Sequence, residues 1–149
     1  MAIARGAGTE IIRSVLLEHV NATGRNLIYG VQHHIYTVLS VTANAVAVNA
    51  DGDYVWCYLV GYDSKGGTTG QVFNIFQNDM SVAQTYVWND KFSFNGNEPT
   101  NFSGPMDDAT KQDAIADQGS SVAQVLYIDA EHASDAIDVH CTFLDQNNA

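Results

Sequence analysis

Apolar and polar residues alternate along most of this chain with a period of two, the pattern of strands that bury one face. In the last run, residues 137–143, apolar side chains hold the odd positions and polar side chains the even ones. Residues 122–128 form a similar run, and a short polar segment, 129–135, connects the two. The pattern therefore predicts two final strands that form a closing hairpin.

Further strands are predicted upstream. Residues 35–41 and 43–48 are rich in β-branched side chains, and Asp51-Gly52 then supplies a turn. Residues 10–20 indicate a strand or an arm, because their apolar positions form no complete helical stripe. The remaining predicted strands cover residues 54–62, 71–76, 82–88 and 91–94.

The segment 54–62 is apolar on both faces. One face carries aromatic side chains with Val60, and the other carries Val55, Cys57 and Leu59. Such a strand is central in its sheet and covered twice, by its own fold or by another subunit. The aromatic side chains of this segment and the next predict a core or an oligomer interface: Tyr54, Trp56, Tyr58, Tyr62 and Trp88. If they are exposed, such rings can also form the platform of a sugar-binding module.

One helix is predicted, near residues 106–118. Gly104-Pro105 precedes it, Asp107 and Asp108 favour its start, and Gly119 is a suitable stop. The whole pattern predicts an all-β fold, a β-sandwich of the jelly-roll form with this short helical insertion. We expect residues 1–25 to form an extended N-terminal arm and the first strand, and residues 26–149 a single sandwich domain.

The basic residues are unevenly distributed. All three arginines, Arg5, Arg13 and Arg25, lie in the first 25 residues, whereas the whole chain of 149 residues has a net charge of −11. Arginine is well suited to desolvated, bidentate ion pairs. The opening segment is therefore interpreted as a docking arm that binds carboxylates of a partner.

The composition excludes several classes of partner. A net charge of −11 argues against binding to nucleic acid, which requires clustered Lys or Arg, and against adhesion to anionic membranes. The opening has no apolar run of signal-peptide length, and no window reaches the length of a transmembrane helix. Synthesis in a cytoplasm is therefore expected, where Cys57 and Cys141 act as small buried apolar residues. A disulfide between them is the alternative and requires that their strands be adjacent.

No residue pattern predicts catalysis or a metal. His33 and His34 are adjacent, so in a strand they point to opposite faces and cannot easily bind one ion. The carboxylates of residues 51–53 and 107–108 lack the ligand series of a calcium loop. The chain has neither a Gly-x-Ser-x-Gly elbow nor a phosphate-binding loop. Three further histidines are interpreted as surface or packing residues: His19, His132 and His140.

Four segments carry a resemblance to a known group of proteins. They are the opening MAIARGAGTEIIRS, the stretch from Gln32 to Val38, the run from Tyr86 to Phe92, and the ending from Thr142 to Asn147. Together they resemble small β-sandwich virion proteins of tailed bacteriophages, and in role the capsid decoration, or cement, proteins of that group.

The resemblance implies a non-enzymatic structural protein without a cofactor. It would act as a homotrimer that binds the major capsid protein on the outside of the head and stabilises the shell, after synthesis in the host cytoplasm. Arg5, Arg13 and Arg25 would then form the capsid-docking arm. Similar sandwiches occur in phage tails and fibres, so a carbohydrate-binding tail or fibre protein is the alternative.

Overall fold

The computed structural model describes residues 9–64, 66–98 and 122–147, and these residues form strands and turns without a helix. The all-β prediction is confirmed. The predicted helix near residues 106–118 and the predicted arm residues 1–8 lie outside the described ranges. The strands are β1 (Thr9–Val20), β2 (Arg25–Tyr29), β3 (His34–Ala47), β4 (Asp53–Asp63), β5 (Thr68–Met80), β6 (Thr85–Trp88), β7 (Phe92–Asn95), β8 (Val125–Ala130) and β9 (Ala136–Asn147).

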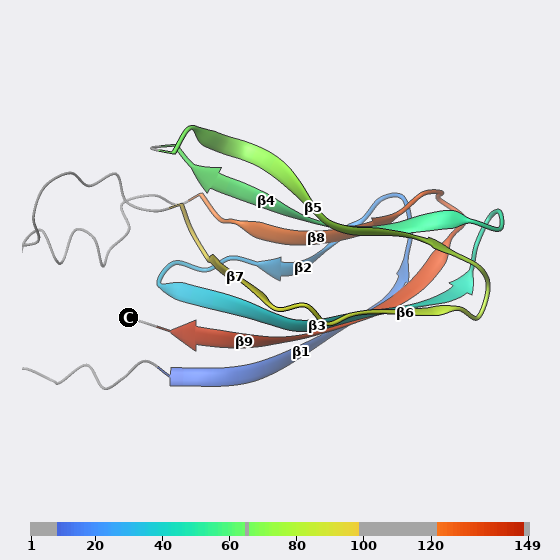
Figure 1. The fold of residues 1–149 in the computed structure, drawn as a ribbon, viewed down its shortest axis with the longest axis horizontal. Helices are drawn as coiled ribbons and strands as arrows, with labels where there is room; N and C mark the ends of the chain where they lie inside the picture. Colours follow the sequence, from blue (N-terminus) through green and yellow to red (C-terminus); the bar gives the residue numbers. More distant parts are fainter. Residues whose placement is uncertain (1–8, 65, 99–121, 148–149) are drawn as a thin grey trace, which may run out of the picture.

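The strands form two antiparallel sheets that face each other (Figure 1). One sheet has the order β1-β9-β3-β6, with β7 also paired to β3, and the other has the order β2-β8-β4-β5. The pairs are nested along the chain: β1 with β9, β2 with β8, β3 with β6 and β7, and β4 with β5. A long hairpin with this nesting, rolled so that β9 also meets β3 and β8 meets β4, is a jelly roll.

The predicted closing hairpin is wrong. Strands β8 and β9 exist close to their predicted positions, but β8 pairs with β2 and β4 whereas β9 pairs with β1 and β3. Both edges of each strand are therefore occupied, and residues 131–135 carry the chain from one sheet to the other. A short polar connection is compatible with either a hairpin or a crossing, so local pattern could not distinguish them.

The predicted first strand is part of the sandwich. Strand β1 runs from Thr9 to Val20 at the edge of the five-stranded sheet, and its register with β9 starts at Thr9 opposite Asn147. The structure also changes the bounds of two other predicted strands. The segments 35–41 and 43–48 form the single strand β3, and the segment 82–88 is shortened to β6 because residues 81–84 form a turn.

The core lies between the two sheets. Alternate residues of the interior strands are fully buried there, including Val55 of β4, Ile128 of β8 and Val139 of β9. Cys57 and Cys141 are buried in this core, as predicted, and both are free thiols. Burial raises the pKa of both thiols, that of Cys141 to about 12, so neither is a reactive thiolate at neutral pH.

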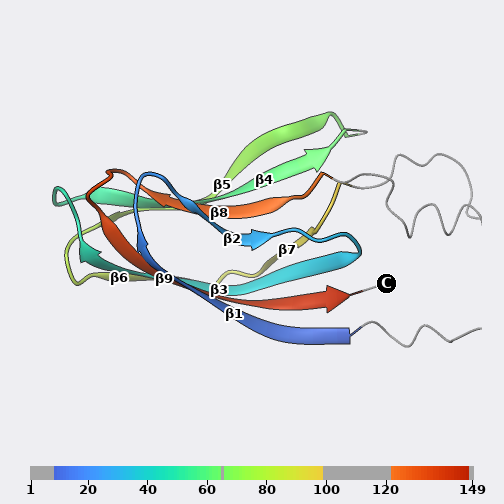
Figure 2. The ribbon, with the colours of Figure 1, turned by 180° about the vertical axis from the view of Figure 1, so that it is seen from behind.

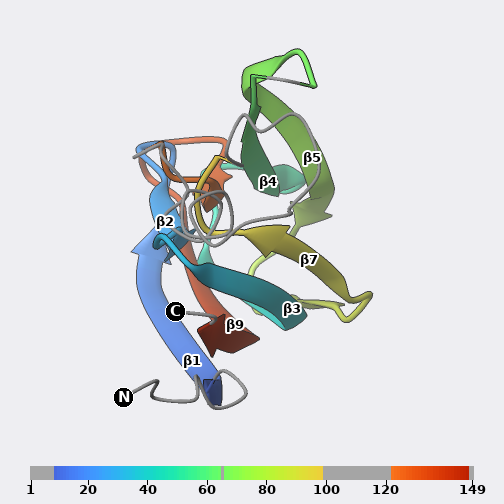
Figure 3. The same ribbon diagram turned by 90° about the vertical axis from the view of Figure 1, so that its left-hand side faces the viewer.

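The two layers lie close together at the end that carries the β8–β9 connection and diverge toward the end where β1 begins and β9 ends (Figures 1 and 2). At the diverging end, the β4–β5 hairpin stands away from the other strands, as the view in Figure 3 also shows. Phe73 lies on β5 in this hairpin and is 69% exposed.

Candidate functional site

Three aromatic rings form a row on the outer face of the four-stranded sheet. Val55 and Cys57 of β4 point into the core, so the alternating residues Trp56 and Tyr58 point outward. Tyr127 of β8 lies directly opposite Tyr58 in the register. The ring centroids of Trp56 and Tyr58 are 4.5 Å apart, and those of Tyr58 and Tyr127 are 4.9 Å apart. We call these three residues the aromatic row.

Hydrogen bonds fix both ends of the aromatic row. Nε1 of Trp56 donates to Oδ1 of Asn74 on β5 at 2.9 Å, and the hydroxyl of Tyr127 donates to the carbonyl of Thr23 at 2.7 Å. The rings are partly buried against one another and are tilted by 42° and 44° in successive pairs. The row is therefore a preformed aromatic surface.

A carboxyl group borders the aromatic row. Asp129 of β8 lies opposite Trp56 in the register, and its Oδ1 atom is buried without a hydrogen-bond partner among the described residues. Burial raises the pKa of Asp129 to about 6. Burial and then the charge of Asp129 raise the pKa of Tyr58 to about 12. Removing this carboxylate from water without a partner lowers the stability of the fold at neutral pH.

We expect Asp129→Asn to stabilise the protein at pH 7 by about 1 kcal/mol. The gain is no larger because the side chain is partly exposed and solvent screens its charge. The carboxyl group has a pKa of about 6 when folded and its ordinary, lower pKa when unfolded. The wild type therefore loses stability as the pH rises from 4 to 7, whereas this loss is absent in the variant. Urea unfolding of both proteins in metal-free buffer at pH 4, 5, 6 and 7 measures the difference. Parallel pH profiles would contradict the prediction.

The structure divides the predicted aromatic set between two faces. Tyr54 and Tyr62 share the outer face of β4 with the aromatic row. Trp88 of β6 instead packs inward against the core, with its ring 5.9 Å from that of Phe76. Tyr127 was missed as a member of the row, because its partnership with Tyr58 depends on strand pairing that the sequence does not reveal.

The predicted arginines have contacts within the chain. Nε of Arg13 on β1 donates to Oδ2 of Asp145 at 2.8 Å, and Arg25 donates to the carbonyl of Glu18 at 3.2 Å. Arg5 lies outside the described residues. Both described arginines are strand residues, Arg13 in β1 and Arg25 at the start of β2.

A cluster of ionisable side chains lies between the two sheets at the diverging end. The buried carboxylate of Asp145 on β9 binds Arg13 of β1 and Nδ1 of His34 on β3, the latter at 2.5 Å. These three residues line a pocket of about 290 Å³ with Tyr36 and apolar residues of β2. The described lining includes no Ser, Thr, Cys or Lys that could act as a nucleophile beside the His34–Asp145 pair. The carboxylate of Asp145 therefore joins strands β1, β3 and β9.

Comparisons with known proteins assign no family. No protein-family model matches the chain, and no curated protein is similar to it in sequence. Among solved structures, the chain is similar to one of Bacillus endospore appendages, described as a novel family of disulfide-linked pili. The identity is 14%, the TM-score is 0.46, and the match covers 100% of this chain and 97% of the other. At that TM-score the likeness carries no functional conclusion. The described residues also contain no helix long and apolar enough to cross a membrane.

Proposed function

We propose that this protein is a non-enzymatic structural subunit of a phage virion, in the specific form of a homotrimeric capsid decoration protein. The observation that carries the proposal is the position of its exposed apolar side chains. Eleven large apolar residues are exposed in the described part of the chain, and seven of them lie on the edge strands β1, β2, β5 and β6. Those seven are Ile11, Ile12, Leu16, Tyr29, Val72, Phe73 and Val87.

Strand β5 is the edge best suited to contact another subunit. It is 13 residues long, and β4 is its one partner strand among the described residues. A long exposed edge invites further strand pairing, and monomeric proteins usually protect it with Lys or Pro. Strand β5 contains neither, and Asp79 is its one charged residue. Together with the exposed side chains of Val72 and Phe73, this edge supports assembly with other subunits.

The location on a capsid rests on the sequence resemblance. A decoration protein that binds the expanded shell and not its precursor stabilises the shell by its binding free energy. The partners in this proposal are two further copies of the chain and the major capsid protein.

The test is the mass of the purified protein in solution and its binding to capsids. We expect a mass near three times 16.1 kDa. Phe73→Lys should shift it to that of a single chain, because a charge replaces an interface side chain. Val82→Lys is the matched control, since Val82 is 60% exposed and lies in the turn after β5. A monomeric wild type contradicts the trimer, and equal behaviour of the two variants contradicts an interface at β5. A folded trimer that does not co-sediment with heads of its own phage contradicts the capsid role.

The aromatic row favours carbohydrate binding by a tail or fibre protein as a second candidate function. The tilted rings of the row, with Asn74 and Asp129 beside them, offer the apolar surface and hydrogen-bonding groups that sugars require. A glycan array separates the two candidates. A signal that is lost in folded Trp56→Ala supports sugar binding, whereas the decoration protein gives no signal that depends on Trp56.

A further inference from the structure

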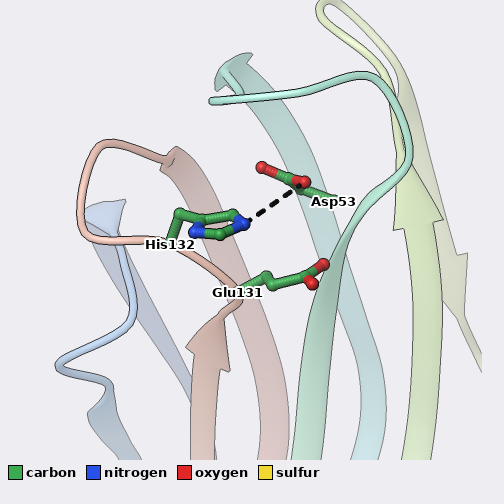
Figure 4. Close-up of side chains that lie close together, drawn as sticks. All are labelled: Asp53, Glu131 and His132. Atoms are coloured by element: carbon green, nitrogen blue, oxygen red, sulfur yellow. Dashed lines mark ion pairs between the residues drawn. The ribbon is translucent and has the colours of Figure 1, made fainter.

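We propose that Asp53, Glu131 and His132 form a binding site for a divalent transition-metal ion, with Zn²⁺ as the ion that best fits the ligands. The site is independent of the proposed assembly. It lies at the end of the sandwich opposite the diverging end, where β4 begins and β8 leads into its connection to β9 (Figure 4). Each residue offers one ligand atom, and these three atoms lie within 4.8 Å of one another.

The buried member of the site is Asp53. Its side chain is 8% exposed, and its Oδ2 atom accepts a hydrogen bond from the backbone N–H of Ala50 at 2.9 Å. Its Oδ1 atom points at Nε2 of His132 across 3.8 Å, which is longer than a hydrogen bond. A carboxylate oxygen of a buried side chain therefore faces the other two ligands and makes no direct hydrogen bond to the imidazole (Figure 4). An ion placed between them would lie close to all three ligand atoms.

The spacing suits coordination. Two ligand atoms bound tetrahedrally to Zn²⁺ lie about 3.4 Å apart, because each is about 2.1 Å from the ion. The Oδ1 to Nε2 separation of 3.8 Å exceeds this by a few tenths of an ångström. His132 is 47% exposed at its side chain, so the ring has room for the small shift that would bring Nε2 and Oδ1 to this spacing.

The backbone on both sides of the site is held by hydrogen bonds. The N–H of Glu131 donates to the carbonyl of Tyr54 at 3.1 Å, and the N–H of Tyr54 donates to Oε2 of Glu131 at 3.2 Å. The N–H of His132 donates to Oδ2 of Asp135 at 2.9 Å. The folded chain therefore positions the ligands before an ion binds, which reduces the entropy cost of binding.

The local charge favours a cation. The two loops that meet at this corner, residues 49–53 and 131–135, contain four carboxylates and neither Lys nor Arg. Two carboxylate oxygens with one imidazole nitrogen suit Zn²⁺, because Ca²⁺ and Mg²⁺ prefer sites composed of oxygen ligands. Water can complete a tetrahedral shell. The sequence alone did not indicate this site, since Asp53 is far along the chain from His132 and neither belongs to a spaced ligand motif.

The experiment uses the full chain without a histidine tag, treated with EDTA and dialysed, and titrated with ZnCl₂ by calorimetry. We expect one Zn²⁺ per chain and a rise in Tm on binding. His132→Gln should weaken binding at least about 10-fold, because it removes the nitrogen ligand. His140→Gln is the matched control, since His140 is an exposed histidine on β9.

Each outcome bears on the site. Saturable Zn²⁺ binding that is weakened in His132→Gln and in Glu131→Gln, unchanged in His140→Gln and much weaker for Ca²⁺, supports it. The site is overturned if the wild type takes up no stoichiometric Zn²⁺, or if His132→Gln binds as tightly as the wild type. Equal loss of binding in His140→Gln also overturns it, because the ion would then be held elsewhere. The unfolding midpoint of each apo variant in urea confirms that it is folded.

Discussion

Gly96→Ala should destabilise this protein by at least about 3 kcal/mol or prevent its folding. A Cβ atom on Gly96 would lie 1.9 Å from the carbonyl oxygen of Val31, and real Cβ contacts are not shorter than 3.0 Å. The obstructing atom belongs to the backbone, so no side-chain rotation can relieve the overlap. Gly30 is equally confined, since its added Cβ would lie 1.9 Å from the carbonyl oxygen of Gly96.

The overlap would separate segments that hydrogen bonds join. Gly96 donates its N–H to the carbonyl of His34 at 2.8 Å and accepts from the N–H of Gln124 at 2.9 Å. Gly30 donates to the carbonyl of Gln124 at 2.8 Å. Urea unfolding followed by circular dichroism measures the loss. Gly61→Ala is the matched control, because an added Cβ there meets its nearest atoms at 3.8 Å. A Gly96→Ala protein as stable as Gly61→Ala would show that Gly96 does not lie as close to the backbone of Val31 as described.

Asp135→Ala should lower the free energy of unfolding by about 3 kcal/mol. Asp135 is 3% exposed, and its two oxygens accept hydrogen bonds from the backbone N–H groups of Asn49 at 2.7 Å and His132 at 2.9 Å. Alanine would leave both donors without this partner at the crossing between the two sheets.

Asp138→Ala serves as the control for Asp135→Ala. Oδ1 of Asp138 also accepts a backbone hydrogen bond, from His19 at 3.0 Å, but that bond is exposed to solvent. Its loss should cost about 1 kcal/mol or less. Thermal and urea unfolding with EDTA present compare the proteins, so that a bound ion makes no contribution. Equal losses in the two variants would refute the distinction between the buried and the exposed carboxylate.

The architecture was predictable as far as local pattern determines it. The alternation in residues 137–143 marks β9, and the doubly apolar segment 54–62 marks β4 as an interior strand with its inner face in the core. The pairing of β8 and β9 with other strands was not predictable from that pattern. A strand in a jelly roll finds its partners far along the chain, and alternation specifies which face is buried but not which neighbour it has.

The candidate sites were less predictable for a related reason. The aromatic residues of β4 were identified as a set, but Tyr127 joins Tyr58 through cross-strand register. The same register places Trp88 on the inner face, away from the outward rings. Asp53 and His132 likewise meet where two loops from different parts of the chain converge. Contacts of this kind depend on tertiary topology.

The place of β9 has a consequence for synthesis on the ribosome. This strand lies between β1 and β3 in the five-stranded sheet, so among the described strands β1 has no partner in that sheet until β9 has emerged. Pairing between residues that are more than 100 positions apart also makes folding slow compared with that of helical domains of similar size. Until β9 has emerged, the apolar edge of β1 should therefore remain available to chaperones.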